Sequence, residues 1–160
     1  MRRIISNEYD VNVIKVVDGD TVDVDIHLGF GVILADERVR IVGIDTPESR
    51  TRDKVEDLFG EAAKARLKEL MDEGAKLMTT EDKHGEDMKG KFGRILGDFR
   101  LPSGEKVTDV LIEEGHAVPY HGGSKDELVG KHMMNRQKLL KEGVVTQEDY
   151  DKALHMMRNR

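Results

Sequence analysis

Alternating apolar and polar residues dominate the first third of the chain. The stretch "TVDVDI", residues 21–26, puts three apolar side chains on one face, as in a half-buried β-strand. The β-forming run "VNVIKVV", residues 11–17, precedes it across an Asp-Gly turn, which predicts a hairpin. Residues 38–44, "RVRIVGI", predict a third strand, and the glycine-containing residues 28–37 before it predict a turn or bulge.

A helical period replaces the alternation after residue 60. Residues 61–74 carry an apolar stripe and end at a glycine, whereas the charged residues 49–60 predict a surface loop. Residues 75–82 and 92–101 predict two more strands, and the short helix that follows ends at Gly115. Five strands with a helix between the third and fourth predict an α+β fold, a five-stranded OB-type Greek-key barrel.

Two amphipathic helices are predicted beyond the barrel, at residues 126–141 and 146–158, and Thr146 is expected to cap the second. The expected organisation is a barrel domain at residues 1–123 and a C-terminal helical extension at residues 124–160. The extension resembles short helical hairpins appended to bacterial and phage proteins. Docking on the barrel, self-association and contact with another protein all remain open as its role.

Composition limits the classes of function that this protein can have. With 32 acidic against 26 basic residues, the net charge of -6 argues against a protein that coats nucleic acid by bulk attraction. This net charge is compatible with an enzyme that has a local basic site. The absence of cysteine excludes disulfides and thiolate chemistry. No signal peptide and no spanning segment is recognised, so a cytoplasmic protein that does not enter a membrane is expected, from a bacterium or a phage.

Two carboxylates are expected to meet at one rim of the barrel. Asp20 opens the second strand and Asp45 follows the third, and neighbouring antiparallel strands bring such positions together. Close carboxylates repel, which favours a raised pKa or a bound cation. Ca²⁺ suits their oxygen ligands better than zinc does. The histidines share no metal-ligand spacing and are expected to be structural or solvent-facing: His27, His84, His116, His121, His132 and His155.

Charged residues near this rim suit phosphodiester cleavage. Arg40 precedes Asp45 and offers parallel donors to a phosphate, while Arg94 enters the fifth strand from the other side. Glu48 follows a proline turn, where it can orient or deprotonate a water. Each feature alone is more typical of a hairpin turn, a cap or a strand-face ion pair. Their combination favours one site.

The segments "VVDGDTV", "VRIVGIDTPE" and "KFGRIL", in that order, resemble the staphylococcal nuclease (thermonuclease) family, over about residues 13–120. The resemblance implies a Ca²⁺-dependent OB-fold nuclease that hydrolyses DNA and RNA with low sequence specificity and leaves 3′-phosphate ends. It also implies roles for individual residues. These are Asp20, Asp45 and the Thr46 carbonyl as calcium ligands, Asp18 as an acid beside them, Arg40 and Arg94 at the phosphate, and Glu48 as the general base.

Three departures from the family pattern bear on activity. Lys91 is kept as a substrate-binding candidate, but Gly90 and Phe92 remove an acid and a phenol expected near the phosphate. Where the family has a tyrosine-lined base pocket after the short helix, this chain has "GHAVPYHGG", residues 115–123. Tyr120 is a candidate for stacking on a base there, with packing in the core or a lid as the alternative. The acidic net charge weakens the field that attracts substrate.

Two other functions compete with catalysis. One is an OB-fold module that binds nucleic acid or protein without cleaving it, and the other is a calcium-dependent interaction protein. Binding modules of this superfamily typically lose the acidic or arginine positions, and an interaction protein needs no arginines beside its acids. The chain has both kinds of residue at the expected positions, which favours a nuclease.

Overall fold

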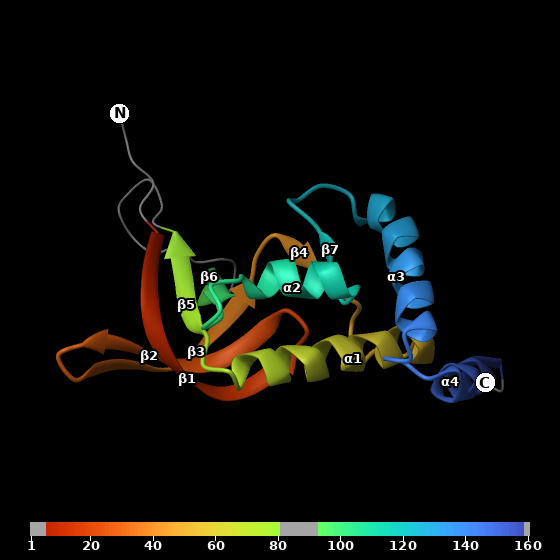
Figure 1. Ribbon diagram of the computed structural model, residues 1–160, viewed down its shortest axis with the longest axis horizontal. Helices are drawn as coiled ribbons and strands as arrows, with labels where there is room; N and C mark the ends of the chain where they lie inside the picture. The colour runs from red at the N-terminus through yellow and green to blue at the C-terminus, as the bar shows by residue number, and fades with distance from the viewer. Residues whose placement is uncertain (1–5, 81–92, 159–160) are drawn as a thin grey trace.

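Five strands close into a barrel in the computed structural model, which describes residues 6–80 and 93–158 (Figure 1). They follow each other in space in the order β1-β2-β3-β6-β5. Their bounds are β1 Ser6–Asp18, β2 Thr21–Gly29, β3 Val32–Ile41, β5 Lys76–Thr80 and β6 Ile95–Arg100. β3 and β6 are parallel and the other neighbours are antiparallel. The expected five-stranded α+β barrel is confirmed.

The hairpin between β1 and β2 forms where the sequence predicts it. Asp18 pairs with Thr21 across the Asp-Gly turn. The alternating residues Val22, Val24 and Ile26 point inward and are at most 2% exposed. This alternation fixes the pairing register, because a shift of one residue would turn these side chains to solvent. The turn before β2 is therefore held at the barrel rim.

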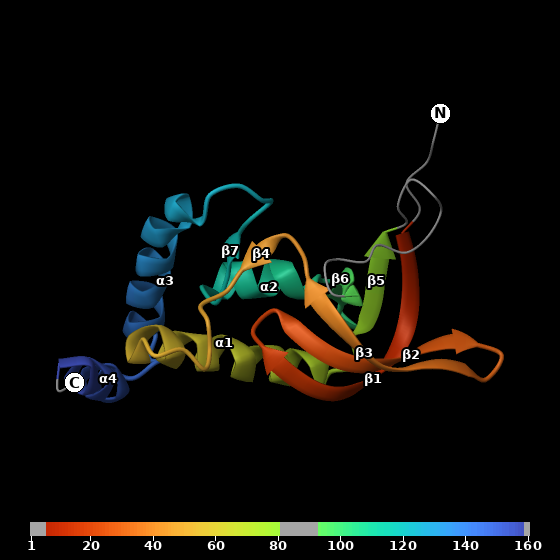
Figure 2. The ribbon, with the colours of Figure 1, turned by 180° about the vertical axis from the view of Figure 1, so that it is seen from behind.

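The hairpin between β2 and β3 is longer than predicted. The turn occupies residues 30–31 alone, and β3 begins at Val32, six residues before the expected strand. Residues 32–34 are β-formers that pair with the end of β2, so the ladder continues beyond the barrel wall. Figures 1 and 2 show this hairpin extending away from the helices, and Phe30 at its tip is fully exposed.

Helix α1, Lys54–Met71, begins before the predicted start at residue 61. Asp53 caps it by accepting hydrogen bonds from the backbone N–H groups of Val55 and Glu56, and such a cap outweighs the irregular apolar period of its first turns. The short helix α2, Val107–Glu114, ends at Gly115 in the left-handed conformation, as predicted. Two short strands, β4 Ile44–Asp45 and β7 Val118–Pro119, pair beside the barrel.

The C-terminal helices pack on α1. A 3₁₀ turn, η2 Lys125–Leu128, leads into α3 Val129–Lys141, and α4 Gln147–Arg158 follows. The predicted cap on α4 is confirmed, because the Thr146 hydroxyl accepts from Asp149 N at 3.1 Å. Both views place α3 and α4 at the end of α1 remote from the β2–β3 hairpin. The buried cluster there joins three helices and consists of Val55, Phe59, Leu139, Val145 and Ala153.

The C-terminal helices α3 and α4 therefore dock against α1 in this structure. In the part of the chain that is described, no helix combines the length and the apolar composition needed to cross a bilayer.

Candidate active site

A cleft of about 360 Å³ opens where the β1–β2 turn, the end of β3 and the loop after β4 meet. We call it the site cleft. It brings together every described residue predicted to bind the metal or the reacting phosphate. Its lining comprises Asp18, Asp20, Thr21, Arg40, Asp45, Thr46, Pro47, Glu48, Ser49, Arg50, Arg94 and Lys125. Four separate segments of sequence, at residues 18–21, 40–50, 94 and 125, therefore contribute to one site.

Strand register places Arg40 beside Asp20. Thr21 at the start of β2 pairs with Arg40 near the end of β3, so the residue before Thr21 lies next to the arginine. Arg40 Nη1 lies 3.2 Å from Asp20 Oδ2, and both side chains are mostly buried. The guanidinium also donates to the carbonyls of Ile41 and Ile44. These contacts hold Arg40 in one orientation at the cleft.

Asp45 is held by two nitrogens from the C-terminal segment. Lys125 Nζ lies 3.0 Å from Oδ1, and His132 Nε2 lies 2.8 Å from Oδ2. Burial opposes ionisation of Asp45, but the hydrogen bonds from His132 and Lys125 prevail, so the pKa of this carboxyl lies below its usual value. The bond to Asp45 in turn raises the pKa of the Lys125 ammonium. Asp45 is accordingly ionised and oriented at neutral pH.

His132 is the site contact that the sequence did not reveal. It was expected to be structural or solvent-facing, yet it bonds directly to a predicted metal ligand. Because 87 positions separate it from Asp45 in the chain, no local spacing could have indicated the contact. Lys125 was missed for the same reason, because it too lies far from Asp45 in the chain.

The loop that carries Glu48 rests on a glycine of α1. A Cβ at Gly60 would lie 2.4 Å from the Glu48 carbonyl oxygen, which is far inside van der Waals contact. This close approach explains a glycine within a helix, where it otherwise costs stability. The backbone N–H of Glu48 also donates to Glu56 at 3.4 Å. The Glu48 side chain itself is exposed to solvent in the site cleft.

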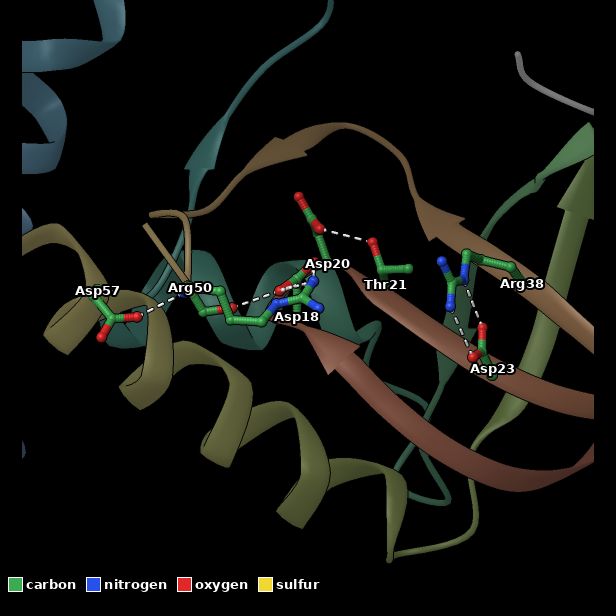
Figure 3. Close-up of polar contacts among 8 residues, drawn as sticks. Asp18, Asp20, Thr21, Asp23, Arg38, Arg50 and Asp57 are labelled. Atoms are coloured by element: carbon green, nitrogen blue, oxygen red, sulfur yellow. Dashed lines mark hydrogen bonds and ion pairs between the residues drawn. The ribbon is translucent and has the colours of Figure 1, made fainter. Parts of the chain in front are cut away.

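The following two residues are tied to Asp18 and Asp57. The Ser49 hydroxyl donates to Asp18 at 2.5 Å, and the Arg50 guanidinium lies 3.3 Å from the same carboxylate. The Arg50 backbone N–H donates to Asp57 on α1 at 2.6 Å. Figure 3 shows Arg50 spanning from Asp57 to Asp18, with Asp20 close by. Asp18 therefore connects the β1–β2 turn to the Glu48 loop.

The remaining candidates differ in placement. Arg94 lies just before β6 and lines the site cleft. Tyr120 donates its hydroxyl to the Gly123 carbonyl at 2.8 Å, and Lys125 Nζ lies 5.6 Å from its ring centroid. Tyr120 thus contacts Lys125, which lines the site cleft, whereas Tyr120 itself does not line it. Lys91 lies outside the described residues.

Oxygen atoms are the donors available to a cation here. Asp20 and Asp45 line the same cleft with Thr46, and oxygen donors of this kind suit a hard ion. Among the residues described, no group of three or more His, Asp or Glu side chains is close enough to hold a metal. Both Asp45 oxygens are engaged by nitrogens. The donor types fit Ca²⁺, provided that Asp45 exchanges these partners for the ion.

Comparison with known proteins shows the family to which the chain belongs. The family model of staphylococcal nuclease homologues matches residues 38–142, which is well over half of the chain. The chain belongs to this family, and its OB-type barrel agrees with that membership.

The similar proteins found are endonucleases of Bacillus subtilis (strain 168). Endonuclease YhcR is 35% identical over 118 residues, which are 71% of this chain and 9% of that protein. The SPbeta prophage-derived endonuclease YokF is 36% identical over 108 residues, covering 68% of this chain and 33% of that protein. Endonuclease YncB is 34% identical over 108 residues, with 68% and 46% covered. The chain thus matches less than half the length of each relative.

Proposed function

We propose that this chain is a Ca²⁺-dependent nuclease that hydrolyses phosphodiester bonds of DNA and RNA with low sequence specificity and leaves 3′-phosphate ends. The observation that carries the proposal is the convergence of Asp20, Arg40, Asp45, Glu48 and Arg94 on one cleft. Membership of the staphylococcal nuclease family and similarity to three endonucleases support it further.

The side chains of the cleft have complementary roles in this mechanism. Arg40 and Arg94 donate hydrogen bonds to the non-bridging phosphate oxygens, whose charge grows in the transition state. Glu48, exposed in the cleft, accepts a proton from the attacking water. The new P–O bond forms as the bond to the 5′-oxygen breaks. The 5′-oxygen leaves as a hydroxyl after taking a proton from solvent, and the phosphate stays on the 3′ end.

Ca²⁺ would be held by the carboxylates of Asp20 and Asp45 and by the Thr46 carbonyl. When bound, the ion would supply positive charge that offsets the charge gained by the phosphate. Asp18 positions the Glu48 loop through Ser49 and Arg50. Lys91 and Tyr120 are proposed to contact the substrate strand.

The test is digestion of single-stranded DNA with Ca²⁺, with Mg²⁺ and with EDTA. We expect Ca²⁺-dependent cleavage, and 3′-phosphate ends that become extendable by a polymerase only after phosphatase treatment. Glu48→Gln and Arg40→Ala should each reduce kcat by roughly 10²-fold or more, because each removes a group that acts in the transition state.

Arg100→Gln is the matched control. Arg100 lies at the far end of β6 from Arg94 and pairs with Glu8 at 2.8 Å, so its loss removes one positive charge away from the cleft. The Arg100→Gln variant should be as active as the wild type. Binding of DNA without cleavage in any metal would contradict the proposal and favour the alternative, a non-catalytic OB-fold binding module.

A further inference from the structure

Arg50 adopts a backbone conformation that is unusual for a residue with a side chain. Its φ of 61° is in the left-handed region, where any residue with a Cβ is disfavoured and glycine is the ordinary choice. The conformation is held by the hydrogen bond from Arg50 N to Asp57 at 2.6 Å. Backbone strain of this kind is concentrated at functional sites, where it aims a side chain.

The Arg50 side chain makes a weak ion pair with Asp18 in the folded protein. The Arg50 guanidinium contacts Asp18 at 3.3 and 3.4 Å and remains 64% exposed. An exposed ion pair of that length contributes little to folding stability. By contrast, Arg38 nearby forms a bidentate pair with Asp23 at 2.8 and 3.1 Å. Arg50 therefore presents a guanidinium to solvent that fold stability does not require.

Arg50 also lies at the junction of two clefts. A second cleft of about 540 Å³, which we call the side cleft, adjoins the site cleft. The two share Asp18, Thr21, Arg50 and Arg94 in their linings. Asp36, Glu37 and Arg38 belong to the side cleft alone, and Arg38 is already paired with Asp23. A polyanion entering this cleft is therefore attracted mainly to the wall with Arg50 and Arg94.

We propose that Arg50 binds a non-scissile phosphate of the substrate strand, and that the strand continues from the site cleft into the side cleft along this wall. The inference rests on the proposed nuclease function and adds a subsite to it. A guanidinium offers a phosphate two parallel donors. Placing this arginine beside the junction would fix the register of the strand relative to Arg40 and Glu48.

The experiment measures binding apart from cleavage. The Glu48→Gln protein is titrated into a short fluorescein-labelled oligothymidylate in EDTA, and Kd is followed by anisotropy over a range of NaCl concentrations. Adding Arg50→Gly should weaken binding roughly threefold to tenfold and make the salt dependence shallower by about 0.7 in slope, because one phosphate contact on a single strand is lost. Arg50→Lys should retain the salt slope, and Arg100→Gln should change neither quantity.

Glycine is chosen because it relieves the backbone while it deletes the side chain. Arg50→Gly should melt at the wild-type temperature or up to about 4 °C higher. A lower melting temperature together with unchanged Kd and salt slope would overturn the inference and make Arg50 a structural clamp on Asp18.

A double variant separates phosphate binding from charge neutralisation. If Arg50 only neutralises Asp18, adding Asp18→Asn to Arg50→Gly should restore binding, and that result would overturn the inference. If Arg50 contacts the phosphate itself, the double variant should still bind weakly with the shallow salt slope. Absence of cleavage by the wild-type protein in Ca²⁺ would defeat the nuclease proposal as well, whereas failure confined to the Arg50 variants would leave it standing.

Discussion

His116 is a buried residue whose proton affinity shapes stability near neutral pH. It is 3% exposed, and its Nδ1 has no hydrogen-bond partner among the described residues. Burial lowers the pKa of His116 below its usual value of 6.5. The unfolded chain therefore binds a proton there more readily than the folded chain does, and the stability due to neutral His116 is lost as the pH falls through the unfolded pKa.

Replacing the ring by an apolar one of similar size should remove this dependence. In His116→Phe, the free energy of unfolding should fall less between pH 8 and pH 5 than it does in the wild type, as measured by urea denaturation at each pH. At pH 8 the variant should be as stable as the wild type or slightly more so, because no unpaired polar atom remains buried. Identical pH profiles would show that the pKa of His116 is the same in the folded and the unfolded chain, and would contradict the prediction.

At the scale of elements, the first turns of α1 lie between α4 and the Glu48 loop, and they contact both. Phe59 and Tyr150 meet edge to face with their ring centroids 6.2 Å apart, and Lys54 N contacts Met157 Sδ at 3.3 Å. Gly60 and Asp57 on the same turns support the loop. The C-terminal helix thus stabilises the segment that positions the proposed general base.

Tyr150→Ala should weaken that support. We expect a loss of about 2 kcal/mol of stability from the missing ring, and a several-fold fall in kcat with KM unchanged. The amide of Arg50 should also exchange its hydrogen faster. Tyr150→Phe keeps the ring contact and should restore all three quantities.

Leu101→Ala provides the comparison, since Leu101 is buried in the barrel cluster rather than in the cluster that joins α1 to α4. It should lower stability without lowering kcat at a temperature where the protein is folded. An equal loss of kcat in both variants would mean that general destabilisation, and not loop position, limits the rate.

Local sequence patterns determined how much of the fold could be predicted. The alternation of Val22, Val24 and Ile26 located β2, and Gly115 located the end of α2. The start of α1 was missed because it depends on the Asp53 cap, which the apolar period does not show. In the site, motif order indicated Asp20, Arg40 and Glu48. The contacts of Lys125 and His132 with Asp45 depend on how α3 docks, which no local pattern encodes.

At the scale of the whole molecule, the site cleft gathers equal numbers of acidic and basic side chains. Its lining holds four carboxylates, on Asp18, Asp20, Asp45 and Glu48, and four cationic side chains, on Arg40, Arg50, Arg94 and Lys125. A divalent cation that binds Asp45 must therefore compete with Lys125, whose ammonium lies 3.0 Å from Oδ1. The C-terminal segment that orients Asp45 also opposes its occupation by a metal.

Lys125→Gln should consequently bind Ca²⁺ several-fold more tightly than the wild type, because it leaves Asp45 with one fewer competing charge. Calorimetric titration gives the affinity, and the rise in melting temperature with added Ca²⁺ gives an independent estimate. Lys152→Gln, which removes an exposed lysine paired with Glu148 on α4, should match the wild type, and Asp45→Asn should abolish the calcium-dependent rise. Equal or weaker Ca²⁺ binding by Lys125→Gln would show that the Lys125 ammonium does not compete with the ion for Asp45.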